Sequence, residues 1–480
     1  SCVEEIIQPM HELEETRKRE LLFDTWKRLA ARERFVFNKL LTGGFRVGVR
    51  KTLVERALAA VAGVEPAVMA HRLMGNWKPS ADDYRRICSG EGDDAARPYP
   101  FYLAYPIEER STAKTDAGKA PIDFEGLLGG PEGWQAEWKY DGIRAQLIKR
   151  GHQILLWSRG EELMTDRFPE ITAAARALPD GVVLDGEVLA WRNGAPLPFG
   201  VLQRRIGRKN VSEKIIRECP TVFLAFDCLE HEGEDIRSRP TEARRTALEE
   251  VVSLVSARGP AGSPAAGEAR GPAAGQMEFG FGPGAGSEEN EPAGLEPSIQ
   301  ATPLVETKGT TWERLAALQG SSRRRGVEGL MLKRRDAAYG VGRVRGDWWK
   351  WKVDPYTLDA VLVYAQAGHG RRAGLYTDFT FAVWADAGRE SLVTVCKAYS
   401  GLSDAEFREI NRWIRGNTLD RHGPVRVVKP ELVFEVAFEG VNRSDRHKSG
   451  LAFRFPRMAR WRRDKTPRDA DTMETVNALL

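Results

Sequence analysis

Residues 137–144 are Glu137-Trp138-Lys139-Tyr140-Asp141-Gly142-Ile143-Arg144 and contain a Lys-x-Asp-Gly sequence. A Lys-x-Asp-Gly sequence by itself also fits a solvated lysine in front of a turn. Its significance comes from the segments that follow it in order along the chain: Ser-Arg-Gly-Glu at 158–161, Leu-Asp-Gly-Glu at 184–187, Phe-Asp at 226–227, Glu-Gly-Leu-Met-Leu-Lys at 328–333, Trp-Lys-Trp-Lys at 349–352 and Arg-Phe-Pro-Arg at 454–457.

These segments supply the groups that a phosphoryl-transfer site needs: a nucleophile, cations for the phosphate oxygens, metal ligands and a pocket for a base. A lysine amine attacks phosphorus only when it is unprotonated, and neighbouring cations with partial burial favour that form. Lys350 and Lys352 are two residues apart, so on a strand both face one side, while Trp349 and Trp351 face the core. An ordinary amphipathic strand with a basic face is the alternative interpretation of this stretch.

The ordered set resembles the nucleotidyltransferase motifs of the covalent ligase and mRNA-capping superfamily, over about residues 96 to 470. This resemblance implies that Lys139 is the nucleophile that ATP adenylates. It further implies that Glu137 contacts the adenine amino group, Phe226 stacks on the adenine, and Glu187 holds the ribose hydroxyls or a metal. A core aromatic is the alternative interpretation of Phe226, because the sequence around it is apolar enough for a buried strand.

The same resemblance assigns the phosphate side of the site. Arg144 and Arg159 bind the sugar-phosphate part of AMP and later the 5′-phosphate of a nick, while the two lysines of 349–352 neutralise the α-phosphate. Arg345 resembles the arginine that precedes those lysines in the family, although its spacing is slightly short and Arg343 is a rival.

The metal and the last motif complete the expected site. Glu328 is the expected Mg²⁺ ligand, because hard cations choose carboxylate oxygen, and Mn²⁺ would fit the same donors; a solvated glutamate at a strand end is the alternative. Arg462, Asp464 and Lys465 match the family's last motif, which orients the pyrophosphate leaving group during self-adenylation. A basic surface strand is the alternative there.

Composition excludes fewer classes of protein than the motifs do. The net charge is +4, from 72 basic and 68 acidic residues, which alone does not indicate a nucleic-acid partner, so the local clusters at 323–325 and 460–463 matter more. Five scattered cysteines without a Cys-x-x-Cys pair disfavour a disulfide framework or a zinc site and fit a reducing cytoplasm. No apolar run approaches the roughly 20 residues that cross a bilayer, so we expect no membrane partner.

The patterning predicts a multidomain protein with three parts. Residues 1–95 are expected to be α-helical, with Arg46 and Arg50 beside a glycine loop. This segment resembles the end of the helical DNA-binding domain of three-domain DNA ligases, shortened at its start since the chain opens on Ser1. Residues 96–353 are expected to form an α/β nucleotidyltransferase (adenylation) domain with antiparallel sheets, interrupted by a disordered Ala/Gly/Pro-rich insertion at 257–298. Residues 354–480 are expected to form an OB-fold β-barrel with one helix.

The combination resembles three-domain ATP-dependent DNA ligases, in a bacterial form similar to the archaeal and eukaryotic replicative enzymes. We therefore expect a monomeric, cytoplasmic, nucleoid-associated enzyme that uses ATP and Mg²⁺ on nicked duplex DNA in repair, replication or recombination. DNA-repair proteins are partners by analogy only. The alternatives are a ligase-like module that binds nicks without sealing them, and an RNA-ligase or capping-type nucleotidyltransferase.

Overall fold

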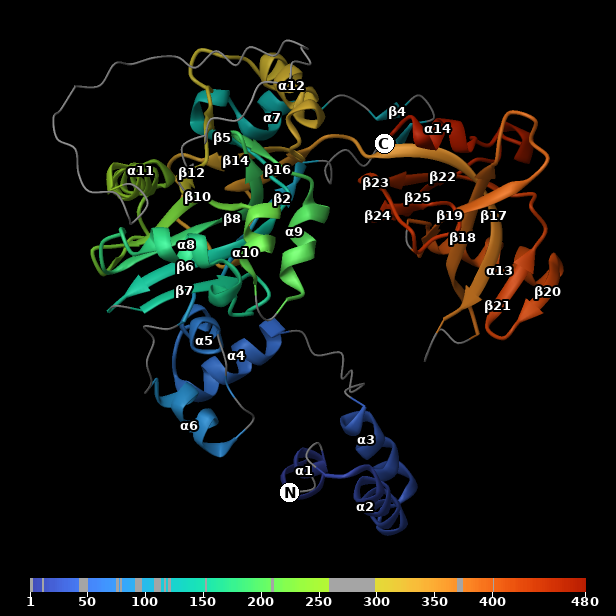
Figure 1. Cartoon of the computed structure of the whole chain (residues 1–480), viewed down its shortest axis with the longest axis horizontal. Coiled ribbons are helices and arrows are strands. Elements are labelled where there is room, and N and C mark those ends of the chain that lie inside the picture. The colour runs from blue at the N-terminus through green and yellow to red at the C-terminus, as the bar shows by residue number, and fades with distance from the viewer. Residues whose placement is uncertain are drawn as a thin grey trace. The chain divides into compact units, whose positions relative to one another are not determined.

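The computed structural model describes residues 3–10, 13–42, 51–74, 77, 80–90, 97–107, 114–115, 118–119, 122–151, 153–208, 211–258, 298–368, 374–399 and 401–480. The chain divides into two compact units, a first unit of residues 1–352 and a second unit of residues 353–480 (Figure 1). The predicted limit at residue 95 lies inside the first unit, so the division into three domains remains a prediction. Within the described residues, no helix is long and apolar enough to span a membrane.

The N-terminal part of the first unit is helical, as the periodicity predicts. One group of helices packs around Ile7, Met10 and Phe37 and comprises η1 Val3–Ile7, α1 Gln8–Met10, α2 Glu15–Arg28 and α3 Ala31–Leu41. A second group packs around Met69 and Ile87 and comprises α4 Lys51–Ala62, α5 Pro66–Arg72 and α6 Ala81–Ser89. The predicted glycine loop with Arg46 and Arg50 lies outside the described residues.

Two β-sheets, antiparallel in most of their pairings, form the rest of the first unit. The larger has the order β11 Glu234–Asp235, β10 Thr221–His231, β8 Val182–Arg192, β6 Ile143–Arg150 and β7 Gln153–Ser158, with β12 Ile299–Ala301 beside β10 and β9 Ala195–Pro196 beside β8. The smaller has the order β13 Leu304–Val305, β5 Trp134–Trp138, β14 Gly329–Arg334, β16 Trp348–Lys352 and β2 Tyr105–Pro106. Parallel pairing occurs between β10 and β12 and between β16 and β2, and the short pair β1 Tyr102–Leu103 and β15 Gly342–Arg343 is also parallel.

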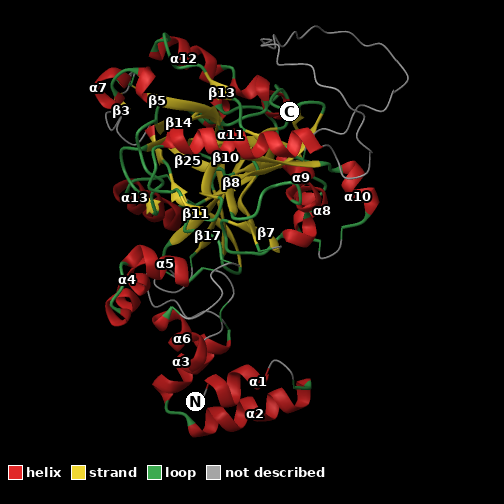
Figure 2. Cartoon of the chain, turned by 90° about the vertical axis from the view of Figure 1, so that its left-hand side faces the viewer, coloured by secondary structure: helices red, strands yellow, loops and turns green. Residues whose placement is uncertain are grey.

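Three apolar layers hold these sheets. The larger sheet packs one face against α8 Pro169–Ala175, α9 Phe199–Ile206 and α11 Thr241–Arg258 (Figure 2). The smaller sheet packs against α7 Phe124–Leu128 and α12 Trp312–Gly320. An aromatic cluster joins residues of both sheets, and its members include Tyr99, Tyr102, Trp157, Tyr339 and Trp348. Of the predicted site residues, Phe226 packs against this cluster, at the seam between the two sheets.

The predicted insertion begins two residues too early, since residues 257 and 258 continue α11. Residues 259–297, which make up most of it, lie outside the described residues.

The second unit is a set of antiparallel strands with one long helix. A central sheet has the order β19 Leu392–Ala398, β18 Tyr376–Trp384, β17 Tyr356–Ala367, β21 Val425–Val428 and β20 Thr418–His422, and β22 Val433–Phe438 bridges β17 to β25 Arg457–Trp461. The hairpin β23 Gly440–Arg443 and β24 Leu451–Arg454 precedes β25. Helix α13 Asp404–Gly416 packs Ile410 and Ile414 into the core and confirms the predicted helix. A short α14 Met473–Asn477 ends the unit.

Candidate active site

Lys139 follows directly after β5 and is fixed by its backbone to the start of β14. Its N–H donates to the carbonyl of Gly329 at 2.8 Å, and the Glu328 N–H donates to the Lys139 carbonyl at 2.7 Å. Gly329 has φ +140°, and a Cβ there would lie 2.1 Å from the carbonyl oxygen of Trp351. Only glycine fits this crossing, which is why the motif needs Gly329 and why Lys139 and Glu328 are held side by side.

The Lys139 ammonium contacts a carboxylate first, not a cation. Its Nζ lies 2.8 Å from Glu328 Oε2, and the Nζ of Lys352 lies 3.3 Å from the same oxygen. Burial alone would raise the pKa of Glu328, but Lys139 and Lys352 outweigh burial and hold it below its ordinary value. Glu328 therefore lies between Lys139 and Lys352, one of the cations expected beside the nucleophile.

Glu187 lies on β8 opposite Arg144 of β6. Its Oε1 accepts a hydrogen bond of 3.1 Å from the N–H of Gly142. A Cβ on Gly142 would lie 2.3 Å from the carbonyl oxygen of Val188, so Asp-Gly allows the turn to approach β8 this closely. Burial raises the pKa of Glu187 to about 7, although Lys139 and Arg144 lower it.

Arg144 is held by protein groups on several sides. It pairs with Asp185 through NH2 at 2.7 Å and Nε at 3.2 Å, and its NH1 donates to the carbonyl of Tyr102 at 2.5 Å. The Tyr339 hydroxyl donates to the same Asp185 carboxylate at 2.6 Å. The guanidinium also lies 5.3 Å from the centre of the Phe226 ring. Sequence interpretation missed Asp185 and Tyr339, although Asp185 stands in the quoted segment at 184–187.

Phe226 owes its position to a β-bulge. Ala225 pairs with Gly186 and Asp227 with Asp185, so Phe226 is an extra residue in β10. Bulges re-aim side chains, and here Phe226 packs with the aromatic cluster, while its neighbour Ala225 faces the helix-covered core. Asp227 is fixed in turn by a buried ion pair with Arg244 of α11, 2.8 Å between Nε and Oδ1.

The Glu137 side chain is buried and forms an ion pair within the protein. Its carboxylate is 2% exposed and contacts the Nζ of Lys333, itself 1% exposed, at 2.8 Å. Lys333 also donates to the Phe226 carbonyl at 2.8 Å and lies 4.5 Å from the centre of the Phe226 ring. Gln135 donates to Glu137 at 2.6 Å. Sequence interpretation missed Lys333, which ends the segment at 328–333.

The alternation predicted for 349–352 is confirmed. Lys350 and Lys352 pair with Met331 and Gly329 of β14 and are partly buried, while Trp349 and Trp351 join the core beneath α7 and α12.

Three arginines expected near the phosphates are exposed. Arg343 and Arg345 both place their guanidinium groups over Tyr105, at 5.5 and 6.0 Å from the ring centre, so the choice between them stays open. Arg159 follows β7, and its N–H donates to the Arg144 carbonyl at 2.9 Å.

The three residues of the last motif gather in the second unit around one carboxylate. Arg462 NH1 lies 3.1 Å and Lys465 Nζ 2.5 Å from Oδ2 of Asp359, which belongs to β17. Asp464 pairs with Arg462 NH2 at 2.6 Å, and Arg462 holds the pKa of Asp464 well below its usual range. Asp359 was not expected from the sequence.

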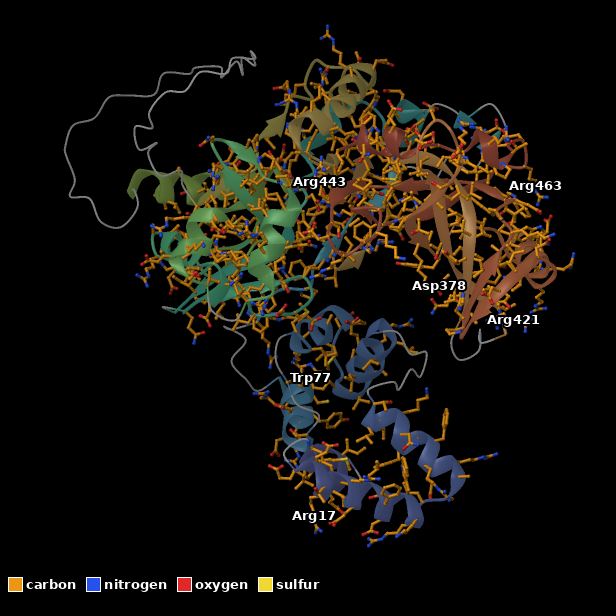
Figure 3. The ribbon with its side chains drawn as sticks, turned by 45° about the vertical axis from the view of Figure 1, so that its right-hand side comes forward. Arg17, Trp77, Asp378, Arg421, Arg443 and Arg463 are labelled. Carbon is orange, nitrogen blue, oxygen red and sulfur yellow. The ribbon has the colours of Figure 1, made fainter. Side chains whose placement is uncertain are left out.

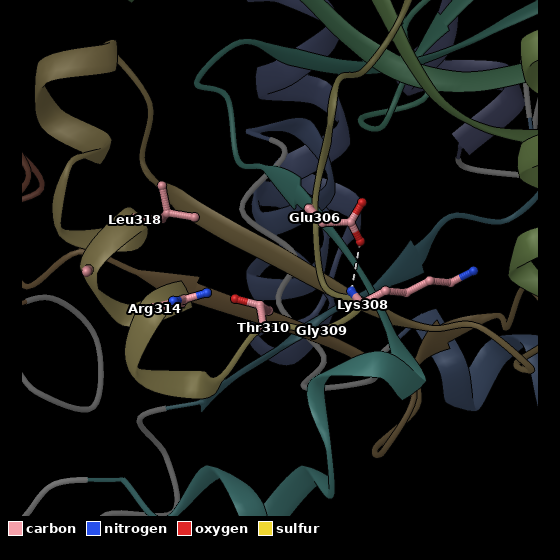
Figure 4. Close-up of a pocket in the computed structure, with 7 residues that line it drawn as sticks. Glu306, Lys308, Gly309, Thr310, Arg314 and Leu318 are labelled. Carbon is pink, nitrogen blue, oxygen red and sulfur yellow. Dashed lines mark hydrogen bonds between the residues drawn. The ribbon is translucent and has the colours of Figure 1, made fainter. Parts of the chain in front are cut away.

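One hollow of about 450 Å³ lies elsewhere in the first unit, beside α12 (Figure 4). It is lined by Glu306, Lys308, Gly309, Thr310, Arg314, Ala317 and Leu318. None of the predicted site residues lines this hollow.

A lysine fixed beside a carboxylate, with two further lysines on β16 of the same sheet, is the arrangement expected of a covalent nucleotidyltransferase. Two family models match the chain: "ATP dependent DNA ligase domain" over residues 125–262 and "ATP dependent DNA ligase C terminal region" over residues 372–465. A "Probable DNA ligase" of Koribacter versatilis is 36% identical over 471 residues, covering 96% of this chain and 74% of that protein. Another, of Anaeromyxobacter sp., is 31% identical, with 94% and 77% covered.

One solved structure gives the same fold at lower identity. The structure "Pmar-Lig_Pre." has a TM-score of 0.50 at 17% identity, with 90% of this chain and 83% of that chain covered. A "mycobacterial DNA ligase D complexed with ATP and MES" has a TM-score of 0.36 at 22% identity, with 78% and 98% covered. The chain therefore belongs to the ATP-dependent DNA ligase family, enzymes that use ATP to seal nicks in DNA, which confirms the resemblance seen in the motifs.

Proposed function

We propose that Lys139 carries the AMP through which this chain seals nicked duplex DNA. The observation that carries the proposal is the double backbone anchoring of Lys139 to Gly329 and Glu328, with its Nζ 2.8 Å from Glu328. This anchoring holds a primary amine in one place, as a covalent nucleophile requires.

The chemistry has three displacements at phosphorus. The Nζ of Lys139 attacks the α-phosphorus of ATP, an N–P bond forms, the P–O bond to pyrophosphate breaks, and the amine gives its proton to solvent. A 5′-phosphate oxygen of the nick then displaces Lys139 and takes the AMP. The 3′-hydroxyl finally attacks the 5′-phosphorus, loses its proton to solvent and releases AMP. Lys350, Lys352 and Arg159 neutralise the phosphate oxygens, so most of the catalysis is charge stabilisation and positioning.

The nucleoside is proposed to lie at the aromatic seam. Phe226 offers a ring for stacking on adenine, and the buried pair of Glu137 and Lys333 lies against that ring and offers an acceptor and a donor to the base edge. Glu187 binds the ribose hydroxyls. Arg144, tied to Asp185, orders this region and contacts the sugar-phosphate, with Arg345 or Arg343 as the further arginine.

The carboxylates of Glu328 and Glu187 fit a Mg²⁺ site. No group of three or more His, Cys, Asp or Glu side chains able to hold a metal occurs among the described residues. This suits Mg²⁺, which binds through one or two carboxylates and otherwise through water and substrate phosphates; Mn²⁺ fits the same donors. A bound ion would supply positive charge at the phosphate oxygens.

The remaining assignments follow the family resemblance. The N-terminal helices are proposed to bind DNA, and the second unit is proposed to be an OB-fold whose Arg462, Asp464 and Lys465 orient the leaving pyrophosphate. Contacts of lysines and arginines with phosphates would make DNA affinity fall steeply with salt. We propose that the enzyme acts as a monomer.

The test is covalent labelling with α-labelled ATP and Mg²⁺. We expect an AMP adduct in the wild type and in Lys308→Ala, an exposed lysine of the same unit, but none in Lys139→Ala. Sealing is then measured on nicked DNA with ATP, with NAD, GTP and nicked RNA in parallel. Absence of any adduct would favour a nick-binding module, a GTP adduct would favour capping chemistry, and preference for nicked RNA would favour an RNA ligase.

A further inference from the structure

Asp359 is a largely buried carboxylate of the second unit that faces a second carboxylate. It is 9% exposed and lies on β17 directly opposite Glu435 of β22. Two carboxylates facing each other across a strand pair repel one another. Arg462 relieves this repulsion, since its NH1 lies 3.1 Å from Asp359 and 3.7 Å from Glu435, and Lys465 adds a second cation.

The two carboxylates nearest to Arg462 differ in how firmly they are held. Asp464 is 61% exposed and takes the Nε and NH2 edge of the guanidinium. Asp359 is anchored by its own backbone: its N–H donates to Asp471 Oδ2 at 2.7 Å, and the Asp471 N–H returns a bond of 2.8 Å to the Asp359 carbonyl. An incoming anion can therefore replace Asp464 far more easily than Asp359.

This difference orients the guanidinium. With NH1 tied to the buried Asp359, the Nε–NH2 edge faces the exposed side, and that edge forms two parallel bonds to carboxylate or phosphate oxygens. Lys465 is fixed by the same oxygen through one of the three donors of its ammonium. The buried Asp359 carboxylate thus positions both cations of the last motif, Arg462 and Lys465.

We propose that Asp359 is a positioning residue for self-adenylation: it orients Arg462 and Lys465 toward the pyrophosphate that leaves ATP. The inference rests on the proposed role of the last motif. It predicts an effect confined to the step that releases pyrophosphate, because sealing of a nick that already carries AMP releases only AMP.

The experiment measures two rates on the full chain: self-adenylation with saturating ATP, and sealing of a chemically pre-adenylated nick. Asp359→Asn keeps the shape but not the charge, and we expect the ratio of the first rate to the second to fall about 10- to 100-fold, as for other supporting residues. A smaller folded fraction lowers both rates equally and leaves the ratio unchanged. Asp378→Asn is the control, since it removes a carboxylate 3.6 Å from Lys397 in the same unit (Figure 3).

Arg462→Ala separates this inference from the proposed function. If Arg462→Ala lowers the ratio and Asp359→Asn leaves it unchanged, the positioning role of Asp359 is overturned while the role of the motif stands. If Arg462→Ala also leaves the ratio unchanged, the role of the motif itself fails. Should Asp359→Asn give no folded protein, Asp359→Glu, which displaces the carboxylate by one methylene, must lower the ratio, and an unchanged ratio overturns the inference.

Discussion

The buried ion pair between Glu137 and Lys333 is expected to stabilise the first unit only as a pair. The variants Lys333→Met and Glu137→Gln each leave the other side chain, at most 2% exposed, without its oppositely charged partner. Removing one member of a buried pair costs about 3 to 5 kcal/mol, whereas replacing both members by residues of similar volume is often close to neutral. The double variant should therefore be more stable than the sum of the single effects.

The magnitude follows from the contacts. Lys333 has a second acceptor, the Phe226 carbonyl at 2.8 Å, which Lys333→Met also leaves without this donor, at a cost of about 1 to 3 kcal/mol. Lys333→Met should thus be the more destabilising single variant. A coupling energy of about 2 to 3 kcal/mol between the two positions is expected, near the top of the range for residues in contact.

The assay is urea unfolding of the full chain, followed by near-UV circular dichroism, which reports the packing of the aromatic cluster. The exposed pair Arg17 and Glu20 on α2 provides the matched cycle, with a coupling below about 0.5 kcal/mol. Additive effects at Glu137 and Lys333, or single variants within about 1 kcal/mol of the wild type, would refute the reasoning.

Three other predictions test the site. The pKa of Glu187 is raised to about 7 from an ordinary 4.5, so its carboxyl adds stability that is complete below pH 4.5 and is lost as the pH rises through 7. Glu187→Gln should therefore gain stability relative to the wild type between pH 5 and pH 8. A stability difference that is independent of pH in urea titrations would contradict this. Gly329→Ala should abolish the AMP adduct and lower the Tm, because its Cβ would lie 2.1 Å from a carbonyl oxygen, whereas Gly200→Ala, with open space around it, should do neither. Phe226→Ala should raise the KM for ATP in self-adenylation, as loss of base stacking worth about 1 to 3 kcal/mol implies; an unchanged KM would mean that Phe226 is only a core aromatic.

Features with short-range causes could be predicted from the sequence. The alternation of Lys350 and Lys352 with Trp349 and Trp351 follows from the two-residue period of a strand. Helix α13 Asp404–Gly416 follows from its amphipathic spacing and from Ser403, whose side chain caps it in reciprocal bonds with Glu406. In both cases a few neighbouring residues contain the whole signal.

Features that depend on pairing between distant segments could not be predicted. Arg144 meets Asp185 and Tyr339 at sequence separations of 41 and 195, and Lys333 meets Glu137 at 196. The bulge that turns Phe226 toward the aromatic cluster exists only in the register of β10 against β8. Motifs therefore indicate candidate side chains, but the partner of each charge is fixed by strand register.

The partners of these charges explain why the site can exist before ATP arrives. A pocket built for a triphosphate concentrates cations, and unpaired cations held close together would destabilise the fold. In the first unit, Glu328 lies between Lys139 and Lys352, and Asp185 holds Arg144; in the second unit, Asp359 holds Arg462. If ATP binds at Lys139 as proposed, its phosphate oxygens must compete with the Glu328 carboxylate for the Lys139 ammonium. Glu328→Gln keeps the shape of the side chain but removes the competing charge. We therefore expect the variant to weaken the dependence of ATP binding on ionic strength less than it weakens the dependence of AMP-adduct formation on Mg²⁺ concentration. The second dependence is measured in a magnesium titration.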